Sequence, residues 1–270
     1  MPTTDRIHAF RQLHESGCFV MPNPWDVGSA HLLAQLGFPA LATTSAGFAW
    51  TQGVRDTHVG RDHVLAHLRA MSGAVDVPFN ADFEDGFAVA PEGVAISVTL
   101  ATATGIAGLS IEDSTDDPSN PLFDCALAVE RIEAARRAID ESGTGIVLTG
   151  RSEGFVAGRP DLAETIRRLT AYAEAGADCL FAPGIRNVAD IKTLVDAVSP
   201  KPVNVVVGGT FTTVAEMTDI GVRRISVGGG LARAALTAVL EAAKEIAERG
   251  TFTGLASAMP GVDFDAMFSR

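Results

Sequence analysis

Short apolar runs alternate with longer segments of helical periodicity along the chain. The runs are almost continuously apolar, which is typical of parallel strands buried on both faces. The segments between them carry apolar residues three or four positions apart, as amphipathic helices do. The pattern predicts eight strands, at residues 18–26, 40–48, 78–87, 108–114, 145–155, 177–185, 202–209 and 224–230. A helix is predicted after each strand, the last over 231–249, and one more helix precedes the first strand.

Eight strand–helix units in 270 residues predict a single domain, 1–270, folded as a closed (β/α)8 barrel of the TIM type. An open doubly wound sheet is the alternative. It would need a glycine-rich phosphate-binding turn after its first strand, where Gly28 stands alone. The segment 250–270 follows the last helix and carries scattered apolar residues. We expect a C-terminal oligomerisation tail that docks on a neighbouring subunit; folding back on its own surface is the other option.

Carboxylates gather where two neighbouring strands end. Asp82 and Glu84 are two residues apart, so in a strand they point to the same side, and Glu112 ends the next strand. The C-terminal ends of barrel strands face the active site. Like charges so close need a neutraliser, and a hard cation such as Mg²⁺ prefers oxygen ligands. The pattern predicts a metal site made of these three acids, against the alternative that they are helix caps and solvated loop ends.

Composition narrows the function. Hydrophobic residues make up 47% of the chain and charged residues 20%, which is enough for a large core. A net charge of −12 argues against nucleic acid and anionic membranes as partners. The three cysteines, Cys18, Cys125 and Cys179, form no CxxC spacing, which favours a reducing, cytoplasmic location. The first residues lack the apolar stretch of a secretory signal, and no apolar run is long enough to span a membrane.

Six segments, taken together and in order, resemble the isocitrate lyase/phosphoenolpyruvate mutase superfamily. They are PNPWDVGSAHLL (22–33), TTSAGFAWTQGVRD (43–56), NADFEDGF (80–87), LSIEDS (109–114), LTGRSEGF (148–155) and GADCLFAPGI (176–185). The resemblance implies a (β/α)8 barrel, dependence on Mg²⁺ (with Mn²⁺ as a substitute) and a small 2-oxo or 2-hydroxy carboxylate as substrate. It also implies a homotetramer, a dimer of dimers, in which the final helix is swapped between subunits.

The resemblance also implies roles for individual residues. Asp82, Glu84 and Glu112 match the acids that bind Mg²⁺ directly or through water, and Asp56 matches an acid near the substrate and the metal waters. Arg151 matches an arginine whose fork suits a carboxylate, although an ion pair with Glu153 or Glu112 would also explain it.

The substrate's carboxylate has its own predicted contacts. The loop Ser45, Ala46 and Gly47 matches one whose backbone N–H groups and hydroxyl hold this carboxylate, and an ordinary strand–helix turn is the alternative. Asn204, in the seventh predicted strand, is expected to line the mouth and bind substrate. Asn120 stands in the loop after the fourth strand, where the superfamily places catalytic residues.

Departures from the superfamily pattern decide the expected reaction. Asn120 stands about where the lyases carry a catalytic cysteine, and residues 114–119 lack the lysine of the mutases and phosphonopyruvate hydrolases. Pro183 replaces a histidine used in phosphoryl chemistry. We therefore expect a Mg²⁺-dependent carbon–carbon lyase, either an oxaloacetate-type decarboxylase or a 2-hydroxy acid lyase, that acts through an enolate. Two alternatives stay open: phosphonopyruvate hydrolase or mutase chemistry, and a catalytically idle protein that binds a 2-oxo acid.

Overall fold

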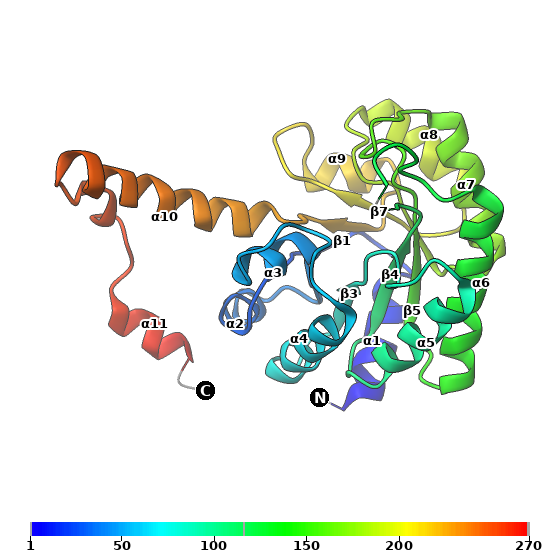
Figure 1. Ribbon diagram of the computed structural model, residues 1–270, viewed down its shortest axis with the longest axis horizontal. Helices are drawn as coiled ribbons and strands as arrows, with labels where there is room; N and C mark the ends of the chain where they lie inside the picture. The colour runs from blue at the N-terminus through cyan, green and yellow to red at the C-terminus, as the bar shows by residue number, and fades with distance from the viewer. Residues whose placement is uncertain (1, 116, 269–270) are drawn as a thin grey trace.

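Eight parallel strands form a nearly closed barrel in the computed structural model, which describes residues 2–115 and 117–268 (Figure 1). The strands are β1 (Phe19–Met21), β2 (Leu41–Ala42), β3 (Phe79–Asp82), β4 (Gly108–Glu112), β5 (Val147–Arg151), β6 (Cys179–Phe181), β7 (Val203–Val206) and β8 (Arg224–Ser226). They pair in the order β1-β8-β7-β6-β5-β4-β3-β2. The Ala42 N–H donates to the Pro22 carbonyl at 3.1 Å and links the two ends of this order. The (β/α)8 barrel prediction is confirmed, and the open sheet is excluded.

Most of the helices surround the barrel, and the first of them closes its N-terminal end. They are α1 (Thr3–Leu13), α2 (Val27–Gln35), α3 (Ser45–Thr51), α4 (Arg61–Ala74), α5 (Pro91–Thr102), α6 (Cys125–Ser142), α7 (Leu162–Glu174), α8 (Val188–Val198), α9 (Val214–Asp219), α10 (Gly230–Arg249), the short 3₁₀ turn η1 (Thr253–Leu255) and α11 (Gly261–Phe268). The ring of Phe10 in α1 is fully buried and would lie 2.8 Å from a Cβ placed at Gly108. Helix α1 therefore plugs the N-terminal end of the barrel.

The direction of the β5 side chains separates the barrel interior from the helical layer. A Cβ at Gly150 would meet Tyr172 of α7 at 2.9 Å and Ala177 at 3.2 Å, so position 150 faces the helices. Successive strand residues alternate in direction. Thr149 and Arg151 therefore point into the barrel, with Arg151 at its C-terminal mouth.

The second predicted strand, 40–48, is much shorter than its apolar run suggested. Strand β2 ends at Ala42, and Thr44 starts helix α3 by accepting a hydrogen bond from the Gly47 N–H at 3.3 Å. A threonine in extended conformation that bonds the third residue onward is a helix N-cap. The small residues predicted as a loop therefore form the first turn of a helix.

Helix α10 leaves the barrel instead of packing on it, as Figure 1 shows. Its apolar side chains Leu236, Val239 and Leu240 are 49%, 65% and 54% exposed. The tail then returns to its own chain: Gln35 of α2 donates a hydrogen bond to the Met267 carbonyl of α11. The sequence prediction put the departure from the barrel at residue 250, whereas the structure puts it at the start of α10. No helix in the described part of the chain is both long and apolar enough to cross a membrane.

Candidate active site

Arg151 is the centre of a charged cluster at the C-terminal mouth of the barrel. Its Nη1 lies 3.1 Å from Asp82 Oδ1 and 3.0 Å from Glu112 Oε2, and its Nε lies 2.5 Å from Glu153 Oε1. These side chains come from β3, from β4, and from β5 with the residues just after it. Because neighbouring parallel strands end at one edge, the predicted acids Asp82 and Glu112 are brought within reach of one guanidinium.

Glu84 reaches the same cluster through an unusual backbone conformation. Its φ of 49° lies in the left-handed region, which is uncommon for a residue with a side chain. In this conformation the Glu84 carbonyl accepts the Glu112 N–H at 3.1 Å, and its side chain is buried. The turn after β3 therefore positions the Glu84 side chain and is hydrogen-bonded to the end of β4.

The acids at the mouth make one another harder to ionise. Burial, together with repulsion from Asp82 and Glu112, raises the pKa of Glu84 to about 9. Burial also raises the pKa of Glu112 to about 8, although Arg151 acts in the opposite sense. Burial opposes the charge of Arg151, but its acidic neighbours outweigh this and raise its pKa well above the ordinary value. The mouth therefore holds more carboxyl groups than one arginine can keep ionised.

Asp56 approaches the cluster from the segment between α3 and α4. Burial of its carboxyl group and repulsion from Asp82 raise its pKa, while a hydrogen bond from the Ser45 side chain lowers it. The Ser45 N–H donates to Asp82 Oδ2 at 2.9 Å. Ser45 therefore links Asp56 to Asp82.

The predicted carboxylate cradle is only partly open. The amides of Ser45 and Gly47 already have protein acceptors, Asp82 and Thr44. A Cβ at Gly47 would come within 2.8 Å of Trp25 Cβ and 2.6 Å of Thr44 Cγ2. Close packing under Trp25 accounts for this glycine, and the Ser45 hydroxyl and Ala46 remain the predicted substrate contacts of this turn.

Two predicted site residues lie apart from the charged cluster. Asn120 is exposed in the loop between β4 and α6, and its backbone N–H donates to the Asp117 carbonyl at 3.1 Å. Asn204 is 2% exposed inside the barrel, where its Nδ2 donates to Ser226 Oγ at 3.1 Å. The structure does not bring Asn120 to the acids, and it places Asn204 within the barrel. Asp116 of the same loop lies outside the described residues.

Asp113 supports the cluster from behind, with partners that the sequence did not reveal. Its Oδ1 accepts the Glu153 N–H at 2.7 Å, and its Oδ2 accepts Tyr172 Oη–H at 2.6 Å and Arg168 Nη1–H at 3.0 Å. Glu153 in turn pairs with Arg151. Tyr172 and Arg168 follow the ordinary spacing of an amphipathic helix, so no sequence signal marks them as parts of the site.

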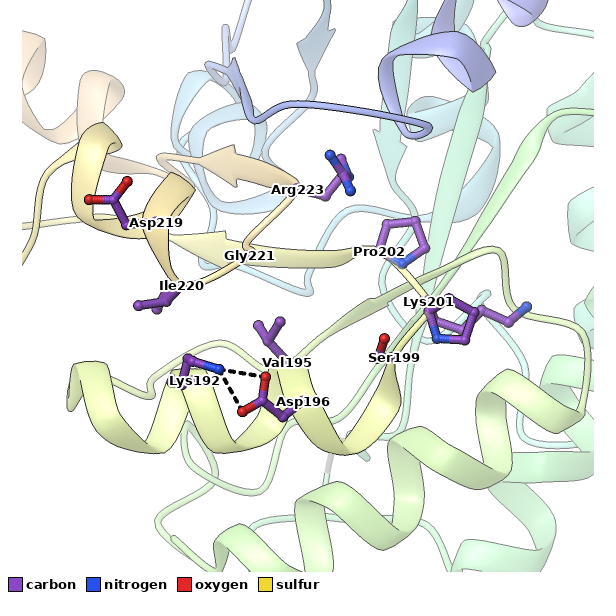
Figure 2. A pocket seen from close by; sticks show the side chains of 11 residues that line it. Lys192, Val195, Asp196, Ser199, Lys201, Pro202, Asp219, Ile220, Gly221 and Arg223 are labelled. Carbon is purple, nitrogen blue, oxygen red and sulfur yellow. Dashed lines mark hydrogen bonds and ion pairs between the residues drawn. The ribbon is translucent and has the colours of Figure 1, made fainter.

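A cavity of about 350 Å³ lies at the opposite end of the barrel, between α8 and the residues leading into β7 and β8. Figure 2 shows Lys192 paired with Asp196 on α8 and Lys201 at the other end of the cavity. Lys192 Nζ is 2.6 Å from both oxygens of Asp196, and Lys201 Nζ donates to the Ala177 carbonyl at 2.7 Å. These charges are satisfied separately and do not converge. The mouth cluster is therefore the candidate active site.

The donors at the mouth fit a hard cation that keeps part of its water. Among residues 2–115 and 117–268, no three His, Cys, Asp or Glu side chains are already arranged to hold a metal ion. Mg²⁺ does not require such a cage, because it commonly binds one or two carboxylates and retains several waters. Mutual repulsion among Asp56, Asp82, Glu84 and Glu112 is what a dication would relieve.

The shifted acids predict how stability depends on pH without divalent metal. An acid whose pKa is raised on folding stabilises the folded state fully below its unfolded pKa, and this contribution is lost as pH rises through the folded pKa. In EDTA, the free energy of unfolding should therefore fall between about pH 5 and about pH 9, by at most about 1.4 kcal/mol per pH unit for one group, and the melting temperature should fall with it. Thermal unfolding across this range measures the effect.

The variant Glu84→Gln should flatten this pH dependence, because it removes the group with the pKa of about 9. Glu92→Gln, at an exposed position in the first turn of α5, is the matched control and should leave the slope unchanged. A melting temperature that rises with pH in EDTA would contradict the proposed crowding of acids.

Comparison with known proteins decides the family. The sequence profile described as phosphoenolpyruvate phosphomutase matches residues 10–247, which is most of the chain. The chain belongs to this family. An uncharacterised Mycobacterium tuberculosis protein is 32% identical over 244 residues and covers 89% of each chain. The predicted membership of the isocitrate lyase/phosphoenolpyruvate mutase superfamily is confirmed.

Relatives with named activities differ in their reactions. The 2-methylisocitrate lyase of Escherichia coli is 31% identical over 62% of this chain and 58% of its own. The oxaloacetate decarboxylase of Paraburkholderia xenovorans is 29% identical over 73% of this chain and 67% of its own. Members of the family therefore act as lyases or decarboxylases on small carboxylates, and enzymatic activity is the expectation for this chain.

Solved structures of family members superimpose closely. A Burkholderia cenocepacia protein, suggested to be a lyase or mutase, is 45% identical, with a TM-score of 0.97 over 99% of this chain and 98% of its own. A phosphonopyruvate hydrolase solved with oxalate and Mg²⁺ is 25% identical, with a TM-score of 0.85 over 100% of this chain and 95% of its own. Mg²⁺ and a small dicarboxylate thus occur together in a protein of the same fold.

Proposed function

We propose that this family member is a Mg²⁺-dependent carbon–carbon lyase that acts on a small 2-oxo or 2-hydroxy carboxylate, and specifically an oxaloacetate-type decarboxylase. The observation that carries the proposal is the cluster in which Arg151 lies between Asp82 and Glu112, with Glu84 and Asp56 beside them. Such a mouth suits a cation and an anionic ligand together. The similarity to an oxaloacetate decarboxylase supports the same substrate class.

In the proposed site, the acids would bind the metal ion, and Arg151 with the turn at Ser45 would bind the substrate. Asp82, Glu84 and Glu112 would hold Mg²⁺ directly or through water, and the ion would stabilise the negative charge that develops when the bond at C3 breaks. Arg151 is fixed by its three acidic partners, so its guanidinium can orient a carboxylate without losing side-chain freedom at each turnover. The Ser45 hydroxyl and Ala46 would hold the other end of the substrate.

The proposed reaction does not require a dedicated general acid or base in the loop after β4. The loop after β4 carries neither the cysteine of the lyases nor the lysine of the phosphoryl-processing members. Asn120, the site residue predicted there, is exposed and forms no hydrogen bond with the acids of the mouth in the described part of the chain. Loss of CO₂ depends mainly on stabilising the charge left on the substrate. Decarboxylation is therefore the reaction that best suits this set of residues.

A coupled assay that follows pyruvate release tests the proposal. Oxaloacetate and a panel of C4–C7 keto and hydroxy acids would be offered with Mg²⁺, with Mn²⁺ and with EDTA. We expect metal-dependent turnover of at least one of them and none in EDTA. Phosphate release from phosphonopyruvate would support hydrolase chemistry instead. Thermal stabilisation by a 2-oxo acid plus Mg²⁺ without any turnover would support the idle binding protein.

We also propose that α10 takes part in a homotetramer, a dimer of dimers, by exchange of the C-terminal helix between subunits. The resemblance to the superfamily implies such an assembly, and α10 exposes an apolar face away from its own barrel. Leu236, Val239 and Leu240 lie on that face, at helical spacing.

Replacing Val239 and Leu240 by glutamate together should shift the protein to a smaller oligomer, because buried apolar contact is exchanged for repelling charge. Light scattering coupled to size-exclusion chromatography measures this mass. Thr237→Glu, on the polar side of the same helix, is the matched control and should keep the native mass. Equal masses for all three proteins would refute a role for this face in assembly.

A further inference from the structure

Among the residues that the structure describes, Arg224 is a buried arginine with no carboxylate partner. It begins β8 and is 1% exposed. Its Nε donates to Asn204 Oδ1 at 2.9 Å, its Nη2 donates to Thr149 Oγ1 at 3.0 Å, and its Nη1 lies 3.3 Å from His14 Nε2. In the described part of the chain, no acid forms an ion pair with it. All three partners are neutral acceptors, so its positive charge is hydrogen-bonded but not compensated.

The groups around Arg224 remain neutral at ordinary pH. Burial, with a further contribution from Arg224, lowers the pKa of His14 to about 3, so the imidazole is uncharged and can accept a hydrogen bond. Cys179 is the acidic group whose charge would favour that of Arg224, but burial raises the pKa of its thiol. An unpaired charge in a barrel core is destabilising unless it interacts favourably with a charge of opposite sign, such as that of a bound ligand.

The guanidinium lies one layer beneath the candidate active site. Strands β5 and β8 are not neighbours, because β6 and β7 stand between them. The contact from Arg224 to Thr149 therefore crosses the barrel interior. Thr149 is two residues before Arg151 on the same inward face of β5, a spacing of about 6.6 Å along the strand. The uncompensated charge thus lies inside the barrel, below the mouth that Arg151 marks.

We infer that Arg224 is an electrostatic determinant of substrate charge: its uncompensated guanidinium attracts an anionic ligand to the mouth of the barrel. This inference rests on the proposed function. With Mg²⁺ bound, the five ionised acids of the mouth would outnumber the positive charges of the ion and Arg151, so an anion would meet repulsion that further positive charge offsets. Because Arg224 lies inside the protein, solvent and salt screen it far less than a surface lysine. It adds positive potential without placing another donor in the mouth.

The expected size follows from Coulomb's law. Two unit charges about 10–15 Å apart, at an effective dielectric constant of about 20, interact strongly enough to change a dissociation constant by about 6–16-fold. The direction of the change in each affinity is as informative as its size. Removing the charge of Arg224 should weaken binding of an anion and strengthen binding of Mg²⁺ at the same mouth. Damage to the structure would weaken both.

The pair His14→Glu and His14→Gln tests the inference from outside the site, because residue 14 follows α1 at the plugged end of the barrel. Glutamate would compensate Arg224, whereas glutamine is neutral and loses the same ring contacts with Phe10 and Phe19. Calorimetry on the full chain would measure Mg²⁺ alone and oxalate at saturating Mg²⁺. We expect His14→Glu to bind oxalate at least about fivefold more weakly than His14→Gln and to bind Mg²⁺ no more weakly.

A second pair keeps the test decisive if His14→Glu does not fold. Arg224→Gln should weaken oxalate binding by the same factor, and Arg224→Lys, which keeps the charge but not the fork, should restore most of it. Equal oxalate affinities within each pair that folds would overturn the inference and leave the proposed function intact. Failure of the unmodified protein to bind oxalate at all would overturn the proposed function, and the inference with it.

Discussion

Replacing Arg151 by glutamine is expected to lower kcat/KM at least about a thousandfold for whichever keto or hydroxy acid the protein turns over. The guanidinium bonds Asp82, Glu112 and Glu153 at once, so no neutral side chain can reproduce its contacts. Its loss removes the cation for the substrate's carboxylate and also leaves three crowded acids without their shared partner. The coupled pyruvate assay measures the change.

Lysine at position 151 should rescue little of this activity. A single ammonium lacks the fork that places Nη1 between Asp82 and Glu112 while Nε meets Glu153. Arg167→Gln is the matched control, because Arg167 is an exposed arginine of α7 that pairs with Glu164. Thermal unfolding shows whether each variant is folded. Near-normal turnover by a folded Arg151→Gln protein would remove this residue from the proposed mechanism.

Asp82→Asn is expected to have the second large effect. The substitution keeps the size of the side chain but removes a negative charge and turns an amide group toward either the Ser45 N–H or Arg151, both of which are donors. If Asp82 binds Mg²⁺, kcat should fall about a hundredfold or more, and the Mg²⁺ concentration for half-maximal activity should rise about 10–100-fold. Metal titration of the steady-state rate separates the two effects.

Asp62→Asn is the control for this prediction, because the Asp62 side chain is 85% exposed on α4. It should leave both the rate and the metal requirement unchanged. An Asp82→Asn protein with a normal metal requirement but a low rate would assign Asp82 to substrate orientation instead of metal binding.

The barrel could be predicted from the sequence because its physical causes are local. Continuous apolar runs mark strands buried on both faces, and helical spacing marks the layer around them. The ends of parallel strands meet at one edge, which is why Asp82 and Glu112 could be placed at a common mouth before their positions were known.

What the sequence did not predict depends on contacts between distant segments. Thr44 caps a helix where the apolar run suggested a strand, because a capping hydrogen bond outweighs a short β-like pattern. The departure of α10 from the barrel has no local signal, since an apolar helical face looks the same whichever surface it covers. Arg224 follows another arginine, Arg223, in the sequence, and only the fold shows that it meets Thr149 and Asn204 from other strands.

The hydrogen bonds of Asp113 connect the candidate active site to helix α7 in the layer around the barrel. Tyr172 and Arg168 reach inward from α7 to the carboxylate that also receives the Glu153 amide. An engineer who transplanted only the strand ends onto another scaffold would leave Glu153 unanchored. A transplanted site therefore needs Tyr172 and Arg168 of α7 in addition to the strand ends. A chimera that exchanges α7 with that of a relative should keep the geometry of the site only if both side chains are retained.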